Sequence, residues 1–336
     1  MSIENQLKLE LNQAAAKRKY PRGLDDRIYR LFDEHRKKKR PSFIRAWRKK
    51  YGSIAVIAAS LLLFSGVAYA STLLYNLQAN NISIEVAGEQ KLQFSQAQLK
   101  EIRASIHEVR QQLSVGESAV VYINELDRVK LPGAQTGMGL TKVNQPKSYT
   151  DITQWKDVVK GNFEGIKIPV ELPQGFTFSS GELESPIGML DAASTAKYYK
   201  PLQQQAAAAK QSMAWQKAAA QDKLAPTDFI TESPRLVYMN SSHDRIEISY
   251  SVMPASDKNI DVKIKTSPSS TADNVQVAGF DAAYTVNNNS FLSDTGVVQD
   301  INWLEQKDGR TVIYHVSSPS TNVSKEELLF VANHMR

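Results

Sequence analysis

The sequence predicts an α+β fold in which short cytoplasmic helices precede one transmembrane helix, followed by an exported domain with an antiparallel β-sheet packed by helices. Three observations predict it: an uncharged apolar run at residues 53–75, a basic segment before that run, and alternating apolar and polar residues over much of the remaining chain. We therefore expect a basic cytoplasmic segment at 1–52, the transmembrane helix at 53–75 and an extracytoplasmic domain at 76–336.

The apolar run has the length and composition of a membrane span. Lys50 is the last charged residue before it, and Glu85 is the first after it. At about 1.5 Å per residue, residues 53–75 would form a helix of roughly 35 Å, enough to cross a hydrocarbon core of about 30 Å. A buried core helix is the alternative, which this length disfavours. The small residues around Tyr69 leave open a signal-peptidase cleavage after Ala70, although the basic region before it is longer than that of a signal peptide.

The charge distribution predicts how the chain is oriented. Residues 1–52 carry 16 Lys and Arg against 6 Asp and Glu, whereas the net charge of the whole chain is only +6. Because basic residues are retained on the cytoplasmic side, we expect a cytoplasmic N-terminus and an extracytoplasmic domain at the cell membrane. Nine basic residues between Arg36 and Lys50 also predict contact with anionic membrane lipid, and they explain the basic pI without direct nucleic-acid binding.

Apolar residues at helical spacing predict two short helices before residue 36. The second helix carries Leu24, Ile28, Leu31 and Phe32 on one side. Two such helices cannot bury enough surface to fold alone, so their apolar sides need the membrane surface or a partner protein. Both alternatives remain open. In the second case these four residues are the partner-binding residues, in the helix-in-groove manner.

Two helices of the exported domain begin with a capping box, in which a Ser side chain and a Gln or Glu three residues later bond to each other's backbone N–H. Ser95 and Gln98 begin the first, and its apolar residues recur at helical spacing from Leu99 to Leu113. Ser324 and Glu327 begin the second, at the end of the chain. Each helix is expected to pack one apolar face against the sheet.

Between these helices, strands alternate apolar and polar residues, as half-buried antiparallel strands do. The elements expected in chain order are a strand at 82–86, a strand at 119–123, a Pro- and Gly-rich loop at 131–148, a short helix at 148–159, a strand pair at 166–170 and 172–183, an exposed helical Ala/Gln-rich insertion at 194–224, strands at 236–239, 246–252, 260–264 and 275–286, and a hairpin of 301–303 with 312–316. Asp308 and Gly309 are a strong signal for the turn of that hairpin.

The sequence shows no pattern typical of catalysis. It contains no cysteine, and its five histidines are scattered singly, without metal-ligand spacing. We interpret His107 as a solvated residue, His243 as part of a turn and His315 as a residue on the sheet surface. The glycines of 131–148 lack the Lys and Ser or Thr of a phosphate-binding loop. We therefore expect a protein that is not an enzyme, with no catalytic, cofactor-binding or metal-binding residues and no cofactor.

The C-terminal stretch INWLEQKDGRTVIYHVSSPSTNVSKEELLFVANHMR resembles the end of the bacterial domain of unknown function 4367 family. The stretches VAGFDAAYTV, SYTD and LPQGFTF resemble the same proteins, so the resemblance covers about 118–336 apart from 194–224. It implies a single-pass membrane protein of Gram-positive bacteria. Some members are encoded beside extracytoplasmic-function sigma factors and are regarded as anti-sigma factors. Residues 1–52 depart from the zinc-binding anti-sigma pattern, because they contain His35 but no cysteine.

Together these observations predict a membrane-anchored protein of signal transduction, an anti-sigma factor or an accessory regulator. Its extracytoplasmic sensor domain would respond to an envelope condition, while the helices at 1–35 hold a sigma factor on the cytoplasmic side. The alternative is a membrane-anchored module that binds lipid, cell-wall polymer or protein of the envelope and has no transcriptional role.

Overall fold

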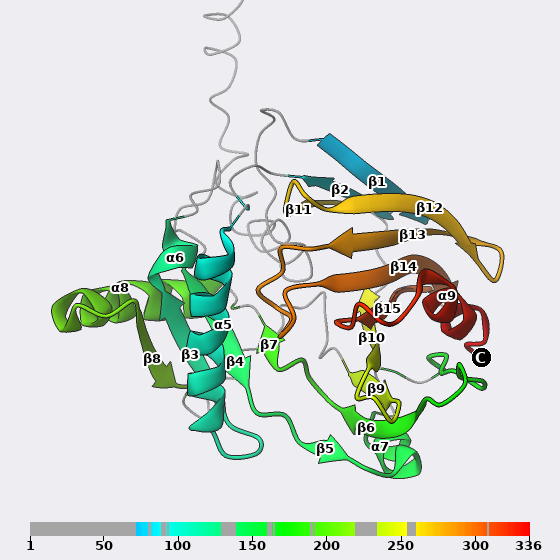
Figure 1. Cartoon of the computed structure of the whole chain (residues 1–336), viewed down its shortest axis with the longest axis horizontal. Coiled ribbons are helices and arrows are strands. Elements are labelled where there is room, and N and C mark those ends of the chain that lie inside the picture. The colour runs from blue at the N-terminus through cyan, green and yellow to red at the C-terminus, as the bar shows by residue number, and fades with distance from the viewer. Residues whose placement is uncertain are drawn as a thin grey trace, which may run out of the picture. The chain divides into compact units, whose positions relative to one another are not determined.

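The computed structural model describes most of the chain after residue 71. The described residues are 72–79, 82–88, 92, 94–128, 139–159, 163, 165–188, 190, 192–218, 234–253, 260–307 and 309–336. Of these residues, 43% lie in strands and 25% in helices. The strands form sheets of eight, four and three strands (Figure 1).

The eight-stranded sheet joins distant parts of the chain in the order β12-β13-β14-β15-β10-β9-β6-β5, and all its neighbouring strands are antiparallel. Its strands are β5 (Ser148–Tyr149), β6 (Thr177–Glu182), β9 (Arg235–Met239), β10 (Arg245–Met253), β12 (Thr271–Val277), β13 (Phe280–Asn287), β14 (Val298–Lys307) and β15 (Arg310–Ser318). The predicted hairpin is confirmed, because Lys307 of β14 pairs with Arg310 of β15. Gly309 has a φ of 73°, which the tight turn requires and glycine adopts without strain.

One face of this sheet packs against α7 (Ile152–Val159) and α9 (Lys325–Asn333). We call it the apolar face. Trp303, Tyr250 and Tyr314 on the sheet and Trp155 on α7 are all almost completely buried there. The predicted capping box of Ser324 is present at the start of α9, which buries Leu328 and Val331 against the same core.

The three-stranded sheet covers part of the opposite face. It consists of β1 (Thr72–Ala79), β2 (Ile82–Gly88) and β11 (Ile260–Thr266), with β2 antiparallel to β1 and parallel to β11. Tyr75 and Leu77 of β1 belong to one buried cluster with Met253, Leu304 and Ile313 of the eight-stranded sheet. The two sheets therefore form two layers with a shared core.

The four-stranded sheet, in the order β7-β4-β3-β8, carries a helix on each face (Figure 1). Its strands are β3 (Ser118–Ile123), β4 (Leu140–Asn144), β7 (Ile187–Gly188) and β8 (Met213–Lys217); the helices are α5 (Gln96–Gln111), the short α6 (Asn124–Asp127) and α8 (Ala192–Ala209). Because side chains alternate along a strand, Val121 of β3 packs with α5, whereas Val120 packs with α8. The predicted capping box of Ser95 is present at the start of α5.

The predicted fold class, with its transmembrane helix at 53–75, is wrong. Strand β1 begins at Thr72, so the end of the apolar run is strand and not helix. Tyr75 and Leu77 are buried while the residues between and after them are exposed, a period of two that a sheet imposes. In the described part of the chain, no helix is long and apolar enough to cross a membrane, and strands outweigh helices. Residues 53–71 and the short helices predicted before residue 36 lie outside the described residues.

Several strand and helix assignments also change. The predicted loop at 131–148 contains β4 and reaches the first residue of β5, and 166–170 is not a strand, although Pro169 forms one bridge with Met335. The predicted insertion at 194–224 splits into α8 and β8, and α8 is not simply exposed. Its Tyr198, Leu202 and Ala206 are buried at helical spacing, so a thin apolar stripe is enough to pack on β3.

Candidate functional site

The second face of the eight-stranded sheet, which we call the polar face, carries two rows of polar side chains. The strand register places Ser249, His315 and Asn302 side by side on β10, β15 and β14. The next row on the same face runs from Glu247 through Ser317 and Asp300 to Thr285. The large rings of these strands, Tyr250, Trp303 and Tyr314, point to the other face, whereas Met253, Leu304 and Ile313 lie on this face where it packs against the three-stranded sheet.

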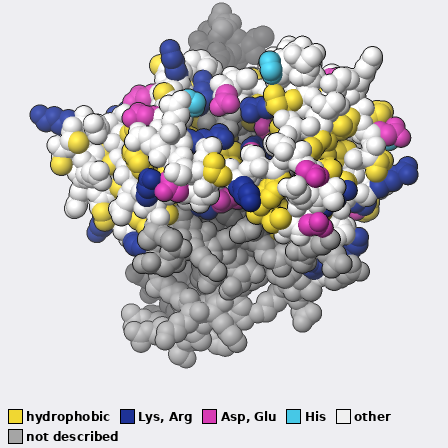
Figure 2. Space-filling view, turned by 90° about the horizontal axis from the view of Figure 1, so that it is seen from below, with side chains coloured by type: hydrophobic (Ala, Val, Ile, Leu, Met, Phe, Trp, Pro, Cys, Tyr) yellow, Lys and Arg dark blue, Asp and Glu magenta, His cyan; other side chains and the backbone are white. Residues whose placement is uncertain are grey.

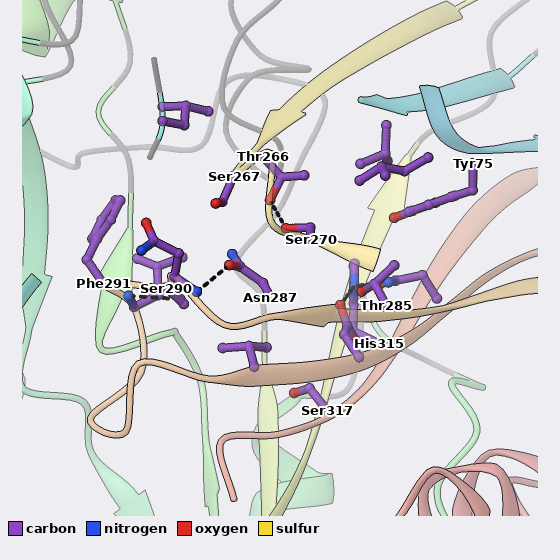
Figure 3. A pocket seen from close by; sticks show the side chains of 18 of the residues that line it. Tyr75, Thr266, Ser267, Ser270, Thr285, Asn287, Ser290, Phe291, His315 and Ser317 are labelled. Carbon is purple, nitrogen blue, oxygen red and sulfur yellow. Dashed lines mark hydrogen bonds and ion pairs between the residues drawn. The ribbon is translucent and has the colours of Figure 1, made fainter. Parts of the chain in front are cut away.

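A cavity of about 320 Å³, which we call the sheet cavity, lies over these rows. Its other walls come from β1, β2, the turn at 266–270 and the loop at 287–292. Figure 3 shows Tyr75 from the three-stranded sheet and His315 and Thr285 from the eight-stranded sheet reaching toward the same space. The volume is within the range of small-molecule sites, which starts near about 300 Å³.

His315, Asn302 and Asp300 form the chemical centre of the cavity floor. The Nδ1 of His315 hydrogen-bonds to the Oδ1 of Asn302, and it lies 3.8 Å from the Oδ2 of Asp300. In the tautomer that donates from Nδ1 to this carbonyl oxygen, Nε2 is an acceptor unless the ring takes up a second proton. Among the described residues, neither this buried Nε2 nor the buried Oδ1 of Asp300 has a hydrogen-bond partner.

The phenol of Tyr75 also lines this cavity. Burial raises the pKa of Tyr75 far above its usual range, and the negative charge of Asp300 raises it further. The phenol therefore stays protonated and remains available as a hydrogen-bond donor.

An apolar wall closes one end of the cavity. Phe94 and Phe291 meet edge to face, with ring centroids 6.1 Å apart. Asn289 holds this contact in place, because its Oδ1 accepts from the backbone N–H of Phe94 at 2.9 Å and its Nδ2 donates to the Phe94 carbonyl at 2.7 Å. The cavity thus offers a polar floor and an aromatic end, an arrangement that can hold a molecule with one polar and one apolar side.

The residues singled out from the sequence do not meet in this site. The partner-binding residues Leu24, Ile28, Leu31 and Phe32 lie outside the described residues. His107 is exposed, as predicted, and its Nε2 lies 2.7 Å from the Nε2 of Gln111. His243 lies in the β9–β10 turn, as predicted, with a φ of 64°.

His315 is the residue that the sequence analysis misplaced. Its side chain is only 15% exposed because the three-stranded sheet and its loops cover the polar face, so it is not on an open sheet surface. A signal was present, because the turn at Gly309 fixes a register that sets His315 opposite Asn302.

The described residues contain no group of three or more His, Asp or Glu side chains that could hold a metal ion. The groups on the cavity floor can donate and accept hydrogen bonds. Comparison of the chain with family models, curated proteins and solved structures finds no match, so the resemblance to the domain of unknown function 4367 family stays a prediction.

Proposed function

We propose that residues 72–336 form the sensor module of a signalling protein, and that the sheet cavity binds the small molecule that is sensed. The observation that carries the proposal is a pair of buried polar atoms that have no hydrogen-bond partner within the described ranges, Asp300 Oδ1 and His315 Nε2, on side chains that line the cavity. A buried polar atom without a hydrogen bond costs about 1 to 3 kcal/mol, and natural proteins retain such atoms mainly for a reason.

The chemistry of the cavity defines the class of ligand. The Asp300 oxygen is an acceptor, as is the Nε2 of a neutral His315, and both favour a molecule that donates hydrogen bonds, such as a sugar or an amino sugar. The carboxylate of Asp300 also favours a positive amine over an anion. The rings of Phe94 and Phe291 suit the apolar face of such a ring-shaped ligand.

A thermal-shift measurement tests this binding. The full chain is melted with glucose, glucosamine, N-acetylglucosamine and short amines, each far above its dissociation constant. Binding at about 100 times that constant stabilises by about 2.7 kcal/mol, which for a domain of this size raises Tm by about 5 to 10 °C. Asp300→Asn and His315→Gln should abolish the shift, whereas Asp273→Asn and His107→Gln, outside the cavity, should keep it. The absence of a shift with every compound would reject this ligand class.

The output of the sensor would be the basic N-terminal segment. In this proposal the helix around Leu24 and Phe32 occupies a groove of a sigma factor, and ligand binding changes how tightly it is held. The support is the segment's apolar pattern and the resemblance described above. The alternative, an envelope-binding module without a transcriptional role, shares the cavity and differs only in lacking this output.

Affinity purification separates these two alternatives. A sigma factor recovered with the full chain and lost without residues 1–35 supports the signalling role. Replacing Leu24, Ile28 and Phe32 together with Asp should have the same effect, and the matched replacement of Ile3, Leu7 and Leu11 serves as the control. Envelope proteins recovered equally with all variants would favour the binding module.

A separate experiment tests on which side of the membrane the N-terminus and the C-terminal domain lie. Because the chain contains no cysteine, single-cysteine variants can be labelled without background. An impermeant maleimide should label Val115→Cys, at a position that is 64% exposed, in intact cells, and Ser2→Cys only after lysis. The reverse pattern would contradict the predicted orientation.

A further inference from the structure

A second cavity of about 310 Å³, which we call the arginine groove, lies beside the sheet cavity. One wall is α5, and the other consists of residues of β6, β9 and β10 on the polar face. The two cavities share Phe291, Leu292, Val298 and Ser317 in their linings. Their charges differ, however, because the groove is lined by four arginines and the sheet cavity by none.

The arginines on the sheet are already paired with carboxylates. Arg235 forms ion pairs with Glu182 at 2.6 Å and with Glu247 at 2.8 Å, and its side chain is 15% exposed. Arg245 lies 3.4 Å from Asp294 and 3.8 Å from Glu247. The three acidic residues lining the groove are thus engaged by two of its four arginines.

The arginines on α5 differ from those on the sheet. Arg103 and Arg110 are seven residues apart, with His107 between them, so all three lie on one side of the helix. Arg103 donates to the carbonyl of Ser290 at 3.4 Å, and Arg110 donates to the side-chain oxygen of Gln145 at 3.1 Å. Within the described part of the chain, neither forms an ion pair with a carboxylate. Each of these contacts uses one of the five N–H groups of a guanidinium.

The loop beside the groove holds Arg103 close to its backbone. A Cβ on Gly296 would lie 2.9 Å from the Nη1 of Arg103, and Gly296 has a φ of 82°. A larger residue would therefore be strained and would also displace the guanidinium. A cation held in position before a ligand arrives loses less side-chain entropy on binding.

Figure 2 shows basic and acidic side chains interspersed over the face drawn there. The excess positive charge of the groove comes from α5. Guanidinium groups bind phosphate in a forked, two-point manner. A phosphate accepts hydrogen bonds in more directions than a planar carboxylate, and it can therefore be contacted from both walls.

We propose that the arginine groove is a binding site for the phosphate group of a phosphoester, held by Arg103 and Arg110 of α5 with Arg245 on the opposite wall. The site is independent of the ligand proposed for the sheet cavity. The phosphate could belong to a soluble ester or to a lipid headgroup, which share this chemistry.

Calorimetric titration of the full chain with glycerol 3-phosphate and with inorganic phosphate tests the proposal. Arg103→Gln and Arg110→Gln should each weaken binding by about tenfold, the factor expected when a charge-assisted hydrogen bond of about 1.4 kcal/mol is lost. Arg128→Gln is the matched control, because it removes the same charge from a side chain that is 64% exposed outside the groove. It should leave the affinity unchanged, and any anion binding by the basic N-terminal segment should be the same in all variants.

Lysine variants and lipid vesicles test the same proposal in two further ways. Arg103→Lys and Arg110→Lys keep the charge and remove the fork, so they should lose less affinity than the Gln variants while melting at the temperature of the unmodified chain. Phosphatidylcholine vesicles with and without phosphatidylglycerol identify a lipid source if their binding depends on Arg103 and Arg110. No binding of esters or vesicles at millimolar phosphate, or binding that is equal in the Gln variants and in Arg128→Gln, would overturn the proposal.

Discussion

The apolar face and the polar face of the eight-stranded sheet are formed by the same strands but carry different kinds of side chain. On the apolar face, Trp303 and Tyr314 stack with centroids 4.9 Å apart and an interplanar angle of 9°, and Tyr250 meets Tyr314 edge to face at 5.7 Å. On the polar face, the neighbouring positions on the same strands carry Asn302 and His315 under a cavity of about 320 Å³.

Under the proposed function, this difference separates stability from binding within one sheet. Large rings on the apolar face fill the space beneath α7 and α9, so we assign most of the folding free energy to it. On the other face, Met253, Leu304 and Ile313 pack against the three-stranded sheet, while polar residues line the cavity between the layers, where we propose that a ligand binds. A step of one residue along a strand moves a side chain from one role to the other.

The largest effect should follow from Trp303→Ala. This residue is fully buried, and its indole N–H donates to Glu305 at 2.8 Å, so the change removes a stacked ring and leaves a cavity. We expect the free energy of unfolding to fall by about 3 to 5 kcal/mol, measured by urea denaturation. Ser317→Ala on the polar face should cost less than about 1 kcal/mol. Equal losses would contradict the assignment of stability to the apolar face.

The second prediction concerns the ion pairs of Arg235. We expect them to stabilise the fold although they lie on the polar face. Burial alone would lower the pKa of Arg235, but the charges of Glu247 and Glu182 raise it above its ordinary value. Arg235→Met leaves two carboxylates without their cation, and we expect a loss of about 3 kcal/mol in the free energy of unfolding. Arg245→Met, whose partners lie 3.4 Å and 3.8 Å away and whose side chain is 33% exposed, should lose less than about 1 kcal/mol. A mild effect at Arg235 would mean that the polar face admits enough water to solvate its charges.

A smaller, pH-dependent effect is expected at Asp244, in the turn between β9 and β10. Hydrogen bonds from Ser320, and then from Asn240 and Asn322, lower the pKa of this carboxyl group. A lowered pKa in the folded state stabilises the protein above the unfolded value near about 3.9, and this contribution is lost as the pH falls through the folded value. Asp244→Asn should therefore lower the unfolding free energy by about 1 kcal/mol at pH 7 and by much less at pH 2. Thermal melts over this range measure it, and a deficit that grows toward acid pH would refute the assignment.

Local signals in the sequence predicted much of the fold. The capping boxes at Ser95 and Ser324 mark α5 and α9, and the turn at Gly309 sets the register of β14 and β15. These features depend on residues close together in the chain. The strand pairing that depends on distant residues was not predictable in this way, such as the parallel pairing of β2 with β11.

The errors have physical causes. The apolar residues at the end of the run 53–75 suit a helix in lipid and a strand in a core equally well by composition, and only their partners in β2 decide between them. The role of His315 depends on what covers its face, and the covering strands β1 and β2 lie more than 200 residues earlier. The sequence therefore shows that a face is polar, but the tertiary structure decides whether it is a surface or a cavity floor.

An effect of similar size, but of opposite sign, is expected at two neighbours on opposite faces. Tyr250 on the apolar face and Ser251 on the polar face are fully buried, and neither hydroxyl has a hydrogen-bond partner among the described residues. Burial raises the pKa of Tyr250 well above its usual range, so its hydroxyl stays neutral. Removing an unsatisfied hydroxyl should stabilise, so we expect Tyr250→Phe and Ser251→Ala each to raise the unfolding free energy by about 1 kcal/mol. If Tyr250→Phe stabilises and Ser251→Ala destabilises, water reaches the Ser251 hydroxyl, and the polar face is hydrated beyond the cavity that the structure shows.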